Sequence, residues 1–150
     1  MYITNKKNWL DFIKNIYIII ILSTILCAID LQYISNECLQ NIENKVYPVL
    51  LILGHHFIAT FLNFGFLFNN KIFLTLFIIG HIITIIHWLT NRNKCFITLD
   101  LNKICNYPKD RLFPDFFWMI GLKKYNWWNQ WGSYIFYILT VFIAFFKIIY

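Results

Sequence analysis

Four long apolar stretches dominate the pattern of hydrophobic and polar positions along the chain. They cover residues 12–34, 47–68, 72–89 and 134–150. Each is close to the ~20 residues that an α-helix needs to cross about 30 Å of hydrocarbon. None alternates between apolar and polar positions, and each is about twice as long as a typical strand. Because backbone groups in lipid must satisfy one another, the pattern predicts four membrane-spanning helices.

The first stretch has a second interpretation, as a cleaved signal peptide. Lys6, Lys7 and Lys14 would then form its positively charged region. Its apolar run is long for such a peptide, however, and no cleavage site with small residues follows it. We therefore expect a helix that is retained.

The connections between the stretches differ in kind. Asn69, Asn70 and Lys71 predict a tight turn, so the second and third helices should form an antiparallel hairpin. Residues 35–46 form a short polar loop, and residues 90–133 form a long one.

A short helix over residues 114–122 is predicted within the long loop. Pro114 is tolerated in a first helical turn, and Asp115 suits the positive end of a helix dipole. The segment is too short to span a membrane, and aromatic side chains that prefer the headgroup level follow it. They are Trp127, Trp128, Trp131 and Tyr134. We expect this helix to lie in the plane of the membrane interface.

Composition agrees with a membrane protein of one domain. Of the 150 residues, 59% are hydrophobic and 13% are charged, and the charged share is about half that of a typical soluble domain. This excludes an ordinary soluble domain and intrinsic disorder. A net charge of +6 would suggest nucleic acid in a soluble protein, but here the positive residues flank apolar stretches. The expected partner is the lipid bilayer and not nucleic acid.

The orientation in the membrane stays open at this point. Five Lys or Arg residues lie on the side of the chain ends, and eight lie on the side of the two longer loops. This excess favours cytosolic loops, whereas the three lysines around the start of the first helix favour the reverse. The five are Lys6, Lys7, Lys14, Lys71 and Lys147, and the eight are Lys45, Arg92, Lys94, Lys103, Lys109, Arg111, Lys123 and Lys124.

Three of the four cysteines lie on the loop side, namely Cys38, Cys95 and Cys105, and Cys27 lies in the first stretch. No C-x-x-C pair is present, so neither a zinc ribbon nor a thioredoxin-type motif is indicated. If the loop side is lumenal, a disulfide such as Cys38–Cys95 is plausible. If it is cytosolic, free thiols are expected.

All four histidines lie in the second and third stretches. His56 and His87 are about 21 and 25 Å from the tight turn, and therefore at similar depth. His56 shares a helix face with Thr60 and Asn63, and His87 shares one with Thr84 and Asn91. We expect these two polar faces to meet. The other two histidines are His55 and His81, and His81 is turned about 120° from His87.

Three interpretations of these polar faces remain open. The first is hydrogen bonding between helices, at about 0.6–2 kcal/mol for each bond. The second is a cofactor site, in which His56 and His87 ligate a b-type haem or, with Cys95, part of a transition-metal site. The third is proton or lipid handling by neutral histidines.

The polar string from His87 to Thr98 crosses the predicted end of the third helix. One interpretation is a helix exit into headgroups, with Trp88 as an anchor and Thr98 capping a following short helix. The other places the string in a polar pocket with the second helix. The candidate members are His56, Asn63, His87, Asn91, Cys95 and Thr98, with His56 and His87 as candidate metal ligands. Asp30 and Lys147, near helix ends, are expected to extend to the interface.

Several of these residues carry a resemblance. His56, Gly65, His81 and the run from Cys95 to Thr98, followed by Asp100 and Asn102, resemble the motif of a small bacterial four-helix membrane family of unknown function. That family has C-P-L-T where this chain has Phe96 in place of proline. The chain also resembles uncharacterised multi-pass membrane proteins of large DNA viruses. The resemblance implies four helices with a motif at one membrane face, and no activity.

We therefore predict an all-α integral membrane four-helix bundle with one short interfacial helix in its long third loop. The leading hypothesis is a structural or interaction component, with no catalytic residue assigned. A second copy or other membrane proteins are its candidate partners. The alternative is a haem- or metal-binding redox or lipid-modifying enzyme that uses the histidines of the second and third helices. A proton-linked carrier is disfavoured, because the chain is short and has no inverted repeat.

Overall fold

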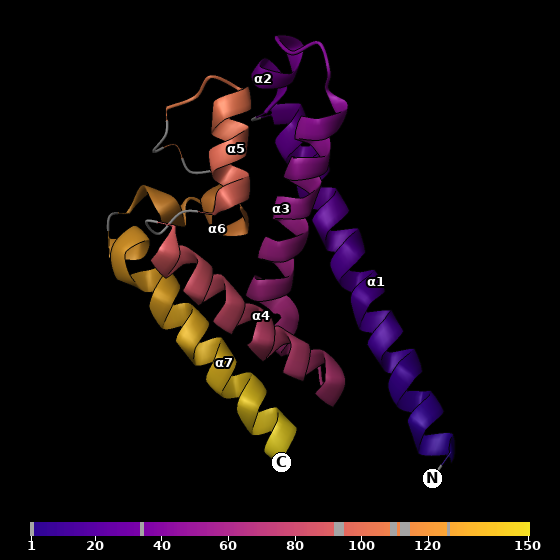
Figure 1. The fold of residues 1–150 in the computed structure, drawn as a ribbon. Helices are drawn as coiled ribbons and strands as arrows, with labels where there is room; N and C mark the ends of the chain where they lie inside the picture. The colour runs from indigo at the N-terminus through magenta and orange to yellow at the C-terminus, as the bar shows by residue number, and fades with distance from the viewer. Residues whose placement is uncertain (1, 34, 92–94, 109–110, 112–114, 126) are drawn as a thin grey trace.

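The computed structural model describes residues 2–33, 35–91, 95–108, 111, 115–125 and 127–150. All the secondary structure of these residues is helical (Figure 1). The prediction of an all-α chain is therefore confirmed.

The four apolar stretches form the four long helices. These are α1 (Tyr2–Tyr33), α3 (Val46–Phe64), α4 (Lys71–Thr90) and α7 (Ser133–Ile149). Among the described residues, three helical segments are long and apolar enough to cross a membrane, namely Lys7–Tyr33, Val46–Leu67 and Lys71–Thr90. The fourth, α7, is shorter at 17 residues.

Short helical elements connect the long ones. They are α2 (Asn36–Gln40), the 3-10 turn η1 (Gly65–Leu67), α5 (Phe96–Ile104), α6 (Phe116–Met119), the 3-10 turn η2 (Leu122–Lys124) and the π-helical turn η3 (Trp128–Gly132). The short helix expected after Thr98 is α5, which begins earlier, at Phe96. It forms because Ile97 and Leu101 lie one turn apart and are buried together against Cys27 of α1 and Ile52 of α3.

The long helices pack as two antiparallel pairs, α1 with α3 and α4 with α7. In Figure 1 both chain ends lie at the lower end, and α2, α5 and α6 lie towards the upper end. A second apolar cluster, of Leu74, Phe77 and Ala144, joins α4 to α7. The turn between α3 and α4 is present as predicted, but the main partner of α3 is α1.

The turn at the lower end is tied by one asparagine and one lysine. Asn70 caps α4 by accepting from Phe73 N, and its Nδ2 donates to Asn8 O at 2.7 Å. Lys147 Nζ donates to Phe66 O at 3.0 Å, where η1 leaves carbonyls without helical partners. Its ammonium thus ties α7 to the turn after α3, and the expectation that Lys147 extends to the interface stays a prediction.

The predicted interfacial helix is much shorter than expected. Asp115 caps α6 by accepting from Trp118 N at 2.9 Å, as its position suggested. The helix ends at Met119, and Gly121 follows with a left-handed φ of 78°, which glycine adopts without strain. Pro114 lies outside the described residues.

Candidate functional site

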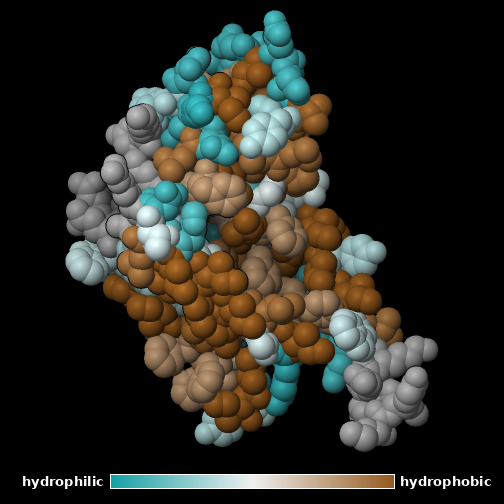
Figure 2. All heavy atoms as spheres, viewed as in Figure 1, coloured by the Kyte–Doolittle hydropathy of each residue, from teal (hydrophilic) through white to brown (hydrophobic). Residues whose placement is uncertain are grey.

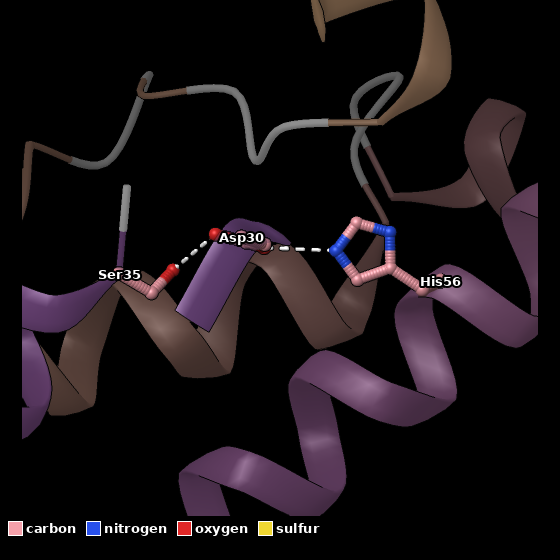
Figure 3. Close-up of polar contacts among 3 residues, drawn as sticks. All are labelled: Asp30, Ser35 and His56. Atoms are coloured by element: carbon pink, nitrogen blue, oxygen red, sulfur yellow. Dashed lines mark hydrogen bonds and ion pairs between the residues drawn. The ribbon is translucent and has the colours of Figure 1, made fainter. Parts of the chain in front are cut away.

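The end of α1 and the middle of α3 meet at a buried polar cluster. His56 Nε2 lies 2.9 Å from Asp30 Oδ2, and both side chains are 0% exposed. Ser35 Oγ donates to the other carboxylate oxygen, Asp30 Oδ1, at 2.6 Å. Figure 3 shows Asp30 between the other two side chains. Both oxygens of one carboxylate are thus engaged.

Local sequence explains how Asp30 reaches this position. It lies on the buried face of α1, three residues after Cys27 and seven after Ser23. The chain turns back directly after α1, where Ser35 N donates to Asp30 O at 2.9 Å. A carboxylate in the last turn of a helix is disfavoured by the helix dipole. The hydrogen bonds from Ser35 and His56 therefore have to compensate.

The contact between Asp30 and His56 links α1 to α3, and we call this pair of residues the Asp30–His56 lock. The contact between His56 Nε2 and Asp30 Oδ2 needs one shared proton, carried either by the ring nitrogen or by the carboxyl group. Buried charges persist only where they are paired and hydrogen-bonded. Loss of either side chain would leave the other without its partner in an apolar interior.

The polar face of α3 continues below His56. Thr60 and Asn63 are each 1% exposed, so the prediction that this face is turned inward is confirmed. His56 Nδ1, Thr60 Oγ1 and both amide atoms of Asn63 have no hydrogen-bond partner among the described residues. A buried polar atom left unpaired costs about 1–3 kcal/mol. The Asp30–His56 contact thus lies at one end of a polar face of α3 whose remaining polar atoms have no hydrogen-bond partner among the described residues.

His87 has a different partner from His56. Its Nε2 accepts from Phe96 N at 3.2 Å, at the start of α5. The two rings lie 5.6 Å apart, edge to face. His56 itself bonds Asp30 of α1 and not His87, so the predicted meeting of the two polar faces stays a prediction.

The other predicted pocket residues lie near the junction of α4 and α5. Asn91 ends α4, and Cys95 precedes α5 and packs on the cluster that contains Cys27 and Ile52. Thr98 is buried inside α5, so the expectation that it caps this helix is wrong. A common pocket of these residues with His56 stays a prediction.

The geometry does not favour the haem and metal interpretations. A haem held between His56 and His87 needs both imidazoles free to point at one iron, and Asp30 holds one while Phe96 N holds the other. Over the described part of the chain, no group of three or more His, Cys, Asp or Glu side chains could hold a metal ion. His81 lies apart from both, with its ring 5.2 Å from Tyr137 of α7.

Replacing His87 by alanine is expected to lower the free energy of unfolding by about 1 kcal/mol. The ring accepts a backbone N–H at a helix start, and loss of such a cap costs about 0.5–2 kcal/mol. Thermal unfolding followed by circular dichroism in detergent would measure the change. Thr24→Ala is the control, because this exposed hydroxyl only bonds its own helix. A loss above about 3 kcal/mol would contradict this capping role.

A disulfide closes the same end of the molecule. Cys38 of α2 is bonded to Cys105, directly after α5, with their Cα atoms 5.1 Å apart. The pairing suggested from the sequence, Cys38 with Cys95, is wrong. Cys95 and Cys27 are free thiols. The bond ties the first connection to the long loop beside the Asp30–His56 lock.

Sequence reasoning missed Asp30 and Ser35 as site residues. Asp30 is the single charged residue between Lys14 and Glu37, and an ionisable residue inside an apolar stretch is by default a functional candidate. The expectation that Asp30 extends to the interface is wrong, because its side chain is fully buried. Ser35 gave no signal of its own, since its role depends on the turn after α1.

Comparison of this chain with family models, with curated proteins and with solved structures finds no match. The resemblance to the bacterial four-helix family stays a prediction.

Proposed function

We propose that this chain is a four-span integral membrane protein with a structural or interaction role, not a catalytic one. The observation that carries the proposal is that apolar side chains are exposed and polar ones are buried, the reverse of a soluble protein. Large apolar side chains are exposed along every long helix, while Asp30, His56, Thr60 and Asn63 are buried. Figure 2 shows the hydrophobic residues spread over the middle of the molecule, with hydrophilic ones gathered at the upper end.

Hydrocarbon is the solvent that suits this surface. Ile83 on α4 is 61% exposed, and Phe142 on α7 is 57% exposed. Apolar patches that extend along whole helices are rare on soluble monomers and cause aggregation in water. In a bilayer they cost nothing, and the polar groups are correctly turned inward.

Length supports α7 as the fourth span. Its 17 residues extend about 26 Å, at the short end of the range for spanning helices. The π-helical turn η3 precedes it directly, and Trp127 and Trp131 are exposed there. Tryptophan is enriched at the headgroup level. The aromatic turn would therefore place the start of α7 at the interface.

The disulfide supports one orientation. Disulfides form and persist in oxidising compartments, so the face with α2 and α5 would lie outside the cytosol. Both chain ends would then be cytosolic (Figure 1). The lysines around the start of α1 agree, whereas the count of five against eight does not. We give the disulfide more weight than the charge count. A disulfide requires an oxidising compartment, whereas the distribution of Lys and Arg is a statistical tendency.

The lock supports a structural role for the polar cluster. Asp30 and His56 are fully buried and bonded to each other, so they hold α1 on α3 and offer no surface to a substrate. The protein would act through the rigid arrangement of its spans. A second copy of the chain or another membrane protein would be its partner.

Extraction of membranes tests the proposal. The chain should remain in the membrane pellet after washing with alkaline carbonate and should be released only by detergent. A peripheral membrane protein in the same preparation, released by carbonate, serves as the control. Recovery of the chain in the carbonate or detergent-free fraction would refute the proposal, and so would turnover of a lipid by the purified protein.

A further inference from the structure

A cleft lies between the first half of α1 and the turn that joins α3 to α4. Its volume is about 570 Å³, and its walls come from α1 and from residues 67–72. It is at the end of the molecule where the chain ends lie, away from the Asp30–His56 lock (Figure 1). Figure 2 shows hydrophilic side chains at the notch on this end, beside hydrophobic walls. Pockets of 300–1,000 Å³ are typical of small-ligand sites.

The depth of the cleft matches a bilayer boundary. Asp11 lines the cleft, and Asp30 lies in the last turn of α1 on the loop side. Their separation of 19 positions corresponds to about 28 Å along the helix, close to the thickness of a hydrocarbon core. If the four helices span the membrane as proposed above, the cleft opens at the headgroup level of the opposite face.

Two opposite charges are available in the cleft. Asp11 and Lys14 are one helical turn apart and both exposed. In the part of the chain that the structure describes, neither has a hydrogen-bond or ion-pair partner. Lys71, also on the wall, is already engaged, because its Nζ donates to Ile148 O at 2.6 Å. Lys14 is therefore the cation that is left for a ligand.

A buried amide completes the polar part of the cleft. Asn15 lines the cleft and is only 8% exposed, and its side chain has no hydrogen-bond partner among the described residues. The hydrogen bond from Asn70 Nδ2 to Asn8 O holds α1 against the turn and fixes the shape of the walls.

The rest of the wall is apolar. Ile18, Leu67 and Ile72 are the aliphatic residues that line the cleft. Leu67 is 58% exposed, which leaves a surface for an acyl chain. The cleft thus combines a cation, an anion and an amide with an apolar wall. These groups complement the charged headgroup and the acyl chains of a phospholipid.

We propose that this cleft binds a zwitterionic phospholipid whose headgroup carries a primary ammonium. Lys14 binds the phosphate, Asp11 binds the ammonium, and the Asn15 amide accepts from or donates to the headgroup between them. A primary ammonium has three N–H donors for the carboxylate and amide oxygens, whereas a quaternary choline has none. An anionic headgroup would lack a partner for Asp11. The inference rests on the proposed function, since the cleft must open to lipid.

Lipid affinity of the purified chain in a neutral detergent tests this inference. Short-chain phosphatidylethanolamine, phosphatidylcholine and phosphatidylglycerol are titrated, and the midpoint of thermal unfolding is followed. We expect the ethanolamine lipid to bind about three- to fivefold more tightly than the other two, the gain of one partly exposed ion pair. Asp11→Asn should remove this preference, and Lys14→Gln should weaken binding of all three lipids.

Matched control variants lie on the loop side. Asp100→Asn and Lys103→Gln change exposed charges of α5 and should leave the lipid preference unchanged. Free phosphoethanolamine is a further arm, and it should compete at least tenfold more weakly than the lipid, because it lacks the acyl chains. Competition at equal strength would overturn a lipid site in favour of a soluble ligand.

Equal affinity for the three lipids, tighter binding of phosphatidylglycerol, or an unchanged preference in Asp11→Asn would each overturn the inference. These failures are distinct from failure of the proposed function. If the proposed function fails, carbonate releases the chain from the membrane. If only the lipid inference fails, the chain still needs detergent but shows no lipid preference.

Discussion

Replacing His56 by leucine is expected to lower the free energy of unfolding by about 3–5 kcal/mol. The substitution leaves the Asp30 carboxylate fully buried with only Ser35 as its partner. Asp30→Leu should cost a similar amount, because it leaves the His56 ring without its partner at Nε2. Titration with sodium dodecyl sulfate from a mild detergent, followed by circular dichroism, measures both changes.

The double variant Asp30→Leu with His56→Leu decides whether the two residues act as a lock. We expect it to recover most of the lost stability, because replacing both partners of a buried pair by apolar groups is often neutral or stabilising. Asp100→Leu, an exposed aspartate on α5, serves as the control and should change stability by less than about 0.5 kcal/mol. Additive losses in the double variant would mean that the two side chains are not coupled.

Removal of the disulfide is the second large effect that we expect. Cys38→Ser should destabilise the protein by about 2–4 kcal/mol, because the bond closes a loop over a sequence separation of 67. Cys105→Ser should cost the same, and the double variant should cost no more than either. Cys95→Ser is the control, since this cysteine is a free thiol.

Modification with maleimide–polyethylene glycol measures the bond directly. In denatured protein, two of the four cysteines should react without reductant, namely Cys27 and Cys95, and all four should react after reduction. Reduction from outside intact cells should expose Cys38 and Cys105 to an impermeant reagent if the loop face is extracytoplasmic. Four reactive cysteines before reduction would remove the support for this orientation.

Much of the helical structure follows from the sequence alone. The four apolar stretches became α1, α3, α4 and α7, since helix formation depends on local hydrogen bonds and a continuous apolar run. Their ends lie near those predicted except at the start of α1, which begins at Tyr2, ten residues before the predicted start. The turn before Lys71 and the cap at Asp115 were likewise local, because each uses side-chain chemistry within a few residues. The buried polar face of α3 also followed from the sequence, because His56, Thr60 and Asn63 are spaced to share one side of a helix.

Which elements meet was decided only in three dimensions. Spacing shows that His56 lies on a polar face, but not that this face meets Asp30, 26 residues away, instead of His87. The choice depends on how whole helices pack, and helix periodicity carries no information about the partner. The same holds for Cys38 with Cys105 and for Lys147 with the end of α3. Local chemistry thus determined the helices and the polar face of α3, and tertiary packing selected the partners that form the lock.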